Sequence, residues 1–194
     1  MRKFERIVGI FVFLLFIYKV LFGSYFDVLL RIVLILFAIF YLWCGFFLFN
    51  RTSLVDLLNR EVRQRISAFK TAAGIVMGMV YSFCILAIMY NIYFYSAMNF
   101  FLISAIIALV SSTTLVGVYN TLNMPLQSFY NQIYRRSLIF GVFLFAFWLT
   151  PIDTRLEVFY KDHPGFIEAY KEYRENPDDP ETQEKLKDER RYIK

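Results

Sequence analysis

Groups that could carry out catalysis or bind a metal are scarce in this sequence. It has one histidine, His163, in the segment KDHPGF, and two cysteines, Cys44 and Cys84, each inside an apolar run. No HExxH or CxxC spacing and no glycine-rich phosphate loop occurs. We therefore expect no catalytic residue, no metal site and no cofactor, and we interpret His163 as a solvated or helix-capping residue.

Charge is also scarce inside the apolar runs, where we find no carboxylate of the kind that proton-coupled membrane proteins use. The net charge of +5 is unevenly distributed: residues 1–150 hold 12 Lys/Arg against 4 Asp/Glu, and residues 151–194 hold 9 against 12. Basic residues that flank apolar runs indicate membrane orientation. This pattern argues against a nucleic-acid-binding protein.

Apolar side chains, in contrast, are abundant, with 58% hydrophobic residues and 23 phenylalanines. Because about 20 apolar residues cross a bilayer as a helix, the sequence predicts spans at residues 7–26, 28–49, 72–95, 100–119 and 133–150. The last span is short, and a re-entrant or interfacial segment is the alternative for it. We expect an all-α, polytopic membrane protein with a membrane domain at 1–150 and a short soluble helical tail at 151–194.

The stretch RTSLVDLLNREVRQRISAFK, residues 51–70, interrupts the apolar sequence with a helical pattern of its own. Its apolar residues recur at helical spacing, and polar residues occupy the opposite face. The pattern predicts an amphipathic helix that lies on the membrane surface. Arg60, Arg63 and Lys70 form its basic face.

Most basic residues of the first 150 can be placed on one side of the membrane, which leaves only Lys19 and Arg31 near the other. By the positive-inside rule, the N-terminus is then cytoplasmic. With five spans the tail lies outside, in the periplasm of a Gram-negative cell. With four spans it would lie inside.

The tail shows start signals for two short helices. Asp162 or His163 precedes Pro164 at the first, and Asp179 precedes Pro180 at the second, which matches an N-cap followed by proline at the first helical position.

A shift of 72 residues places the first two predicted spans over the third and fourth, and pairs Ser24 with Ser96, Asp27 with Asn99 and Gly45 with Gly117. The spans therefore form two tandem hairpins plus one further helix. The turn stretches IYKVLFGSYFDVLL and MYNIYFYSAMNFFL resemble the membrane hairpin of the GldL family of gliding-motility and type 9 secretion proteins in the Bacteroidota. Lys19 keeps the basic position of that family's turn and Asn91 does not. The resemblance implies an inner-membrane hairpin protein without the motor function, since the family's His-Trp-Pro segment and membrane carboxylate are absent.

Three groups of polar or small residues are candidate sites. Lys19, Asp27 and Arg31 form a charge cluster at the outer interface; we interpret it as a snorkelling lysine beside an Asp27–Arg31 ion pair, and an anion path or lipid-headgroup site is the alternative. Small residues at four-residue spacing predict close helix packing, preferentially between the third and fourth spans, with dimerisation through GIVMG as the alternative; they are Gly74, Gly78, Ser82, Ser104, Ala108 and Ser112. The hydroxyls of SSTT, residues 111–114, either bond the carbonyl one turn back or line a polar path.

These features together favour a non-enzymatic accessory, scaffold or assembly subunit of a bacterial inner-membrane complex, in contact with lipids and with other membrane subunits. A small transporter or channel is the alternative function, and a mitochondrial inner membrane the alternative location.

Overall fold

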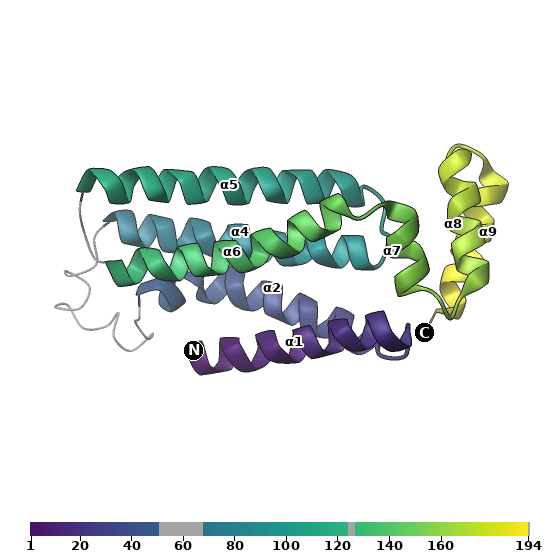
Figure 1. The fold of residues 1–194 in the computed structure, drawn as a ribbon, viewed down its shortest axis with the longest axis horizontal. Coiled ribbons are helices and arrows are strands. Elements are labelled where there is room, and N and C mark those ends of the chain that lie inside the picture. The colour runs from purple at the N-terminus through teal and green to yellow at the C-terminus, as the bar shows by residue number, and fades with distance from the viewer. Residues whose placement is uncertain (51–67, 124–126, 194) are drawn as a thin grey trace. The chain divides into compact units, whose positions relative to one another are not determined.

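The computed structural model describes residues 1–50, 68–123 and 127–193, and these residues form helices and no strand. The all-α prediction is confirmed (Figure 1). The predicted surface helix, with Arg60 and Arg63, lies outside the described residues except for its last three. The helices are α1 (Arg2–Phe22), α2 (Asp27–Asn50), α4 (Ala68–Ile92), α5 (Met98–Asn123), α6 (Gln127–Leu149), α7 (Ile152–Phe159), α8 (Pro164–Glu175) and α9 (Pro180–Tyr192).

Four of the described helices are long and apolar enough to cross a membrane: Asp27–Asn50, Ala68–Ile92, Met98–Leu122 and Phe129–Leu149. The chain therefore has the make-up of a multi-pass integral membrane protein. The helix that contains the predicted span at 133–150 is one of the four. It is long enough because it begins before the apolar residues of that span. Helix α1, the first predicted span, is not one of them, since Glu5, Arg6 and Lys19 interrupt its apolar sequence. The count of five spans and the tandem-hairpin arrangement remain predictions.

The contacts between residues divide the chain into two compact units. The bundle unit comprises Met1–Val8 and Leu34–Leu149, and the tail unit comprises Gly9–Val33 and Thr150–Lys194. The predicted boundary at residue 150 follows hydropathy, whereas this division follows contacts. It groups the end of α1 and the start of α2 with the C-terminal helices.

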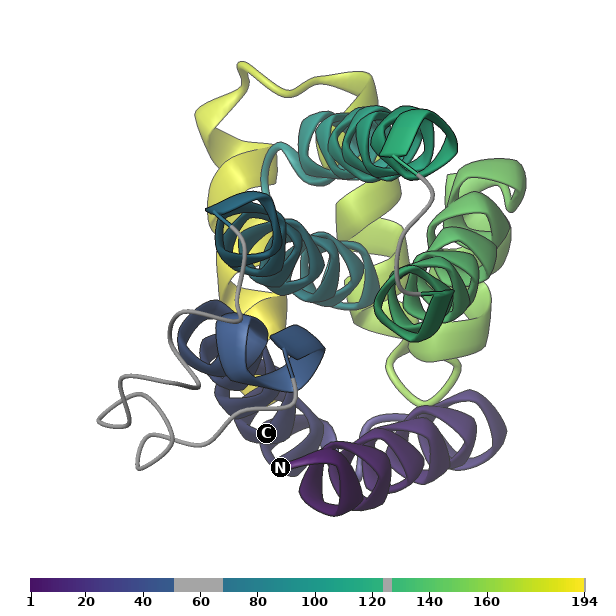
Figure 2. The ribbon, with the colours of Figure 1, turned by 90° about the vertical axis from the view of Figure 1, so that its left-hand side faces the viewer.

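Helix α4 is the centre of the bundle unit, as Figure 2 shows in a view along the helices. In the 18-residue apolar segment of α4 that could cross a membrane, 61% of the segment is buried, against 22% in the corresponding segment of α5 and 28% in that of α6. Met77, Tyr81, Cys84 and Ala87 are fully enclosed. Large exposed side chains on α5 and α6 are what lipid-facing helices carry, because lipid solvates them as well as a protein core does.

Close contact between α2 and α4 depends on glycine. A Cβ added to Gly78 would lie 2.7 Å from the carbonyl oxygen of Tyr41 and 2.9 Å from the Cα of Gly45. Gly74 faces Phe46 and Asn50 in the same way. Packing between α4 and α5, the third and fourth predicted spans, is also present. The prediction that the glycine stripe serves that contact is wrong, because Gly74 and Gly78 face α2.

The tail unit contains three short helices, of which α8 and α9 begin at the predicted prolines and α7 was not predicted. The Asp179 side chain accepts a hydrogen bond from the Glu181 N–H at 3.2 Å, which confirms the predicted N-cap. Phe166, Ala169 and Leu186 form the buried side of the α8–α9 pair. Ion pairs on its surface join α7 to α8 and α8 to α9, through Glu157–Lys171, Asp153–Arg174 and Glu172–Lys185.

The two hairpin turns place a buried nitrogen at the positions that the 72-residue shift aligns. Lys19 reaches Asp27, the first residue of α2, and the Asn91 side-chain amide donates to the carbonyl of Met98, the first residue of α5, at 3.1 Å. Each nitrogen ties the end of one helix to the start of the next. The predicted repeat itself stays a prediction.

Candidate functional site

The most strongly built polar cluster of the tail unit lies where α1 turns into α2. The Lys19 ammonium donates to both carboxylate oxygens of Asp27, at 2.6 and 2.7 Å, and each side chain is only 2% exposed. The Tyr160 ring lies 4.5 Å from the Lys19 nitrogen, in cation–π geometry. A buried pair of this kind is costly to form but more costly to break, because the remaining charge would be unpaired in a dry environment.

One sequence-based interpretation of this cluster is corrected by these contacts, and a second is refined. Lys19 does not snorkel to an interface, because it is enclosed with Asp27. The Asp27 carboxylate is bound by Lys19 across the turn, eight residues away, and its predicted partner Arg31 acts on it through charge as well. Arg31 lies half-buried one turn further along α2.

The C-terminal tail contacts the same turn through the loop between α7 and α8. One oxygen of Asp162 accepts hydrogen bonds from the Ser24 backbone N–H at 2.9 Å and the Ser24 hydroxyl at 2.5 Å. His163 Nε2 lies 2.6 Å from the same hydroxyl. The Lys161 ammonium donates to the carbonyls of Val20 and Leu21, at the C-terminal end of α1, where a cation is favoured by the helix dipole.

The backbone of the turn is shaped for this contact. Gly23 has φ of +84°, and a Cβ at that position would lie 2.5 Å from the Asp162 carboxylate. Only glycine combines this left-handed conformation with so close an approach. Glycine at position 23 therefore serves both the turn and the contact with the tail.

Asp162 is held as an anion by these partners. Partial burial favours its neutral form, but the hydrogen bonds from the Ser24 hydroxyl and backbone N–H outweigh burial and lower the pKa of Asp162. The neighbouring His163 acts in the same direction when charged. The ionised carboxylate is therefore the form that fastens the tail to the turn.

Serine, histidine and aspartate meet here, but not in the order of a hydrolase triad. The Ser24 hydroxyl donates to Asp162, whereas in a triad the aspartate would accept from the histidine, and Ser24 is 3% exposed. His163 occupies the N-cap position of α8, yet its side chain forms no capping hydrogen bond. The cluster is arranged to join two segments of the chain.

No protein-family model, curated protein or solved structure matches this sequence. The candidate site is therefore interpreted from its own geometry.

The small residues predicted for packing have different surroundings. Ser82 is buried in α4 beside the glycine face, while Ser104, Ala108 and Ser112 are half-buried in α5. The row of α5 that faces inward is a different one: Leu102, Ala105, Leu109 and Val116.

Two hydroxyls of the SSTT run, those of Ser111 and Thr113, form hydrogen bonds within the protein. Ser111 donates to the Ile107 carbonyl at 2.6 Å, as the local alternative predicted, and Thr113 lies 2.8 Å from Ser137 of α6.

Lys70, placed on the basic face of the predicted surface helix, lies in the first turn of α4, and its carbonyl accepts from Asn50 at 3.3 Å.

The sequence analysis missed a second buried charge cluster, in the bundle unit. The Glu5 carboxylate accepts from Arg136 Nε at 2.6 Å, from Arg136 Nη2 at 2.5 Å and from the Tyr41 hydroxyl at 2.6 Å. The two charged residues are 131 positions apart. The available signal was that Glu5 is the one carboxylate among the basic residues at the start of the chain.

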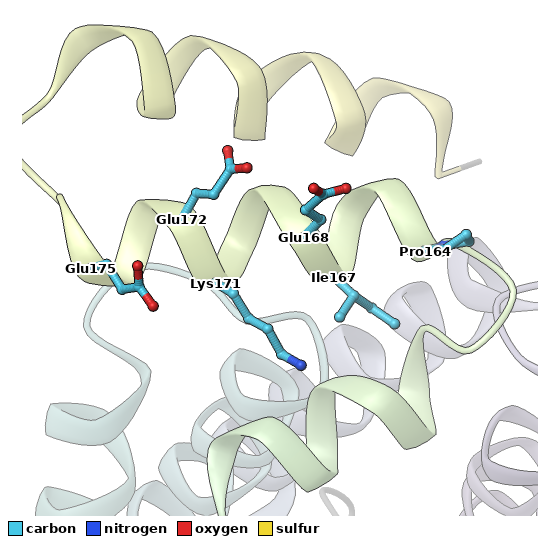
Figure 3. Close-up of a pocket in the computed structure, with 6 residues that line it drawn as sticks. All are labelled: Pro164, Ile167, Glu168, Lys171, Glu172 and Glu175. Carbon is cyan, nitrogen blue, oxygen red and sulfur yellow. The ribbon is translucent and has the colours of Figure 1, made fainter.

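Helix α8 carries an open groove of about 450 Å³ (Figure 3). Glu168 and Glu172 point to the side of α9, and Lys171 and Ile167 point to the opposite side. Lys171 is bound to Glu157 and Glu172 to Lys185. The tail thus presents an acidic surface whose side chains are ordered by ion pairs.

Proposed function

We propose that this chain is a non-enzymatic accessory or scaffold subunit of a membrane protein complex, and that its C-terminal helices are the part that holds a partner outside the bilayer. The observation that carries the proposal is the junction of Ser24 with Asp162 and His163. It converts the tail from a loose extension into a folded element fixed to a membrane hairpin. A partner bound to α8 and α9 is then held at a defined position.

The four candidate membrane spans are consistent with this arrangement. The α1–α2 turn and the tail touch, so both lie on the same side of the membrane. The helices between them are α2, α4, α5 and α6, and an even number of crossings returns the chain to the side from which it started. A re-entrant α6 would leave three crossings and separate Asp162 from Ser24.

For helix α1 we propose a fifth span. Its Lys19 is neutralised by Asp27, which reduces the cost of placing this charge near the membrane. The N-terminus and the tail then lie on opposite sides, and the basic residues of the first 150 place the N-terminus in the cytoplasm. The location is a bacterial inner membrane, as the resemblance to the GldL hairpin implies.

The transporter alternative relied on the Lys19, Asp27 and Arg31 cluster and on the SSTT run. Lys19 and Asp27 neutralise each other in a closed pair, and Ser111 bonds its own helix. These contacts favour a structural role for the polar residues.

Purification of the tagged chain from its native membrane in a mild detergent tests the proposal. We expect other membrane proteins at constant stoichiometry, and we expect Asp162→Ala to lose a soluble or peripheral partner while the chain still inserts. Asp178→Ala, in the exposed turn between α8 and α9, is the matched control. Recovery of the chain alone, or equal recovery of partners with both variants, would contradict the proposed function.

A further inference from the structure

The Glu5 cluster has the form of a ligand in a receptor site. Its carboxylate receives two parallel N–H donors from the Arg136 guanidinium, with N–O distances of 2.6 and 2.5 Å, and a hydroxyl donor from Tyr41 at 2.6 Å. Paired donation from arginine with a further donor is how proteins recognise carboxylates and phosphates.

The donors are held by contacts that do not involve Glu5. Arg136 Nη1 donates to the Gln132 carbonyl at 3.3 Å, and the guanidinium lies 5.0 Å from the Phe49 ring centre. The Tyr41 ring packs edge-on against Tyr81 and Phe140, at 5.6 and 5.7 Å. Helices α2, α4 and α6 therefore build the donor side of the site by themselves.

The acceptor comes from a different part of the chain. Glu5 lies in the first two turns of α1, and only Met1–Val8 of that helix belong to the bundle unit. The Glu5 and Arg136 side chains are 11% and 13% exposed, so the guanidinium has little water to compensate its charge without an anion.

We propose that Arg136 and Tyr41 form an anion-binding site for a carboxylate or phosphate group, and that Glu5 is its internal ligand. When the first two turns of α1 withdraw, the site accepts a free anion or the phosphate of a lipid headgroup. The start of α1 is thus a replaceable plug. This inference concerns the bundle unit and does not depend on the proposed function of the tail.

Anion rescue of Glu5 variants tests the site. In detergent micelles, Glu5→Ala should lower the Tm by about 10 °C, because one partner of a buried pair is left uncompensated. Sodium acetate or inorganic phosphate should recover much of this loss, and sodium chloride at the same ionic strength should not. The Glu5→Ala/Arg136→Gln double variant should show no recovery, whereas Glu5→Ala/Arg135→Gln, which changes the neighbouring exposed arginine, should recover as the single variant does.

Glu5→Gln removes the charge and keeps the side-chain length, so it serves if the alanine variant does not fold. It should show the same anion dependence with a smaller amplitude. The source of the anion is distinguished by nanodiscs: stabilisation in phosphatidylglycerol over phosphatidylcholine, without a response to acetate or phosphate in micelles, assigns the site to a lipid headgroup. If neither variant responds to acetate, phosphate or anionic lipid more than its Arg136→Gln counterpart does, the proposal is overturned.

Discussion

Among the residues that the structure describes, the bundle unit and the tail unit each hold one largely enclosed ion pair, and the two pairs differ in the distance along the chain that they join. Lys19 and Asp27 are eight residues apart, so their pair closes a single turn. Glu5 and Arg136 are 131 residues apart, so their pair joins the first helix of the bundle to its last. The first pair stabilises a hairpin that is already local, whereas the second defines which helices are neighbours.

The tail unit also holds a second class of charged contact. Lys19 and Asp27 are each 2% exposed, while the ion pairs between α7, α8 and α9 are between 40% and 59% exposed. Since water screens exposed pairs and not enclosed ones, equal numbers of ion pairs do not mean equal stabilisation. The following substitutions test this difference, from the largest expected effect to the smallest.

Breaking the enclosed pair at the turn should have the largest effect. Asp27→Leu leaves the Lys19 ammonium without its partner in a dry environment, and we expect a loss of about 3 to 5 kcal/mol in the free energy of unfolding. Denaturant unfolding in micelles measures it. Lys19→Met/Asp27→Leu should recover most of the loss, and a double variant as unstable as the single one would show that the charges are not the cause.

Gly78→Ala should weaken the contact between α2 and α4. The added Cβ meets the Tyr41 carbonyl at 2.7 Å, backbone that cannot move aside easily, and we expect a cost of about 2 kcal/mol. Gly141→Ala is the control, because its nearest neighbour is a Leu109 methyl at 3.9 Å. Thermal unfolding of the two variants compares them directly, and equal Tm values would refute the close contact.

Weakening the contact between the tail and the α1–α2 turn should have an effect of intermediate size. Asp162→Asn removes the charge that accepts from Ser24 and should weaken the junction by about 2 kcal/mol, the scale of a hydrogen bond to a charged group. Proteolysis of the tail should accelerate, with α2 and α4 unaffected. Cleavage rates unchanged from those of the native chain would count against the junction.

The same junction should depend on pH with a definite sign. Because the pKa of Asp162 is lowered in the docked state from the ordinary 3.8, its contribution is complete above that value. It should be lost as the pH falls from 3.8 through the lowered pKa. Tail cleavage by an acid-active protease should rise in that window, and Asp162→Asn should abolish the change.

Loss of an exposed ion pair should have the smallest effect. Asp153 and Arg174 are 47% and 43% exposed, and we expect Arg174→Gln to change the stability of the tail by at most about 0.5 kcal/mol. Hydrogen exchange of the α7 and α8 amides measures it. A loss comparable to that of Asp162→Asn would mean that exposure does not separate the two classes of contact.

Hydropathy along the chain determined the helical class and four of the five predicted spans, those at 28–49, 72–95, 100–119 and 133–150, because each depends on residues within about one helix length of one another. Local signals such as Asp179 before Pro180 belong to the same class. They need no knowledge of what the helix packs against.

Only the tertiary structure decided which residues contact each other. Lys19 and Asp27 were identified as a cluster, but which charge pairs with which depends on how the turn folds back at Gly23. Glu5 with Arg136, Ser24 with Asp162, and Gly78 with α2 join segments that no periodic pattern relates. The helical repeat determines which residues share a face of one helix. Which other helix packs against that face depends on the packing of the whole chain, because the native arrangement minimises unpaired charge and empty space together.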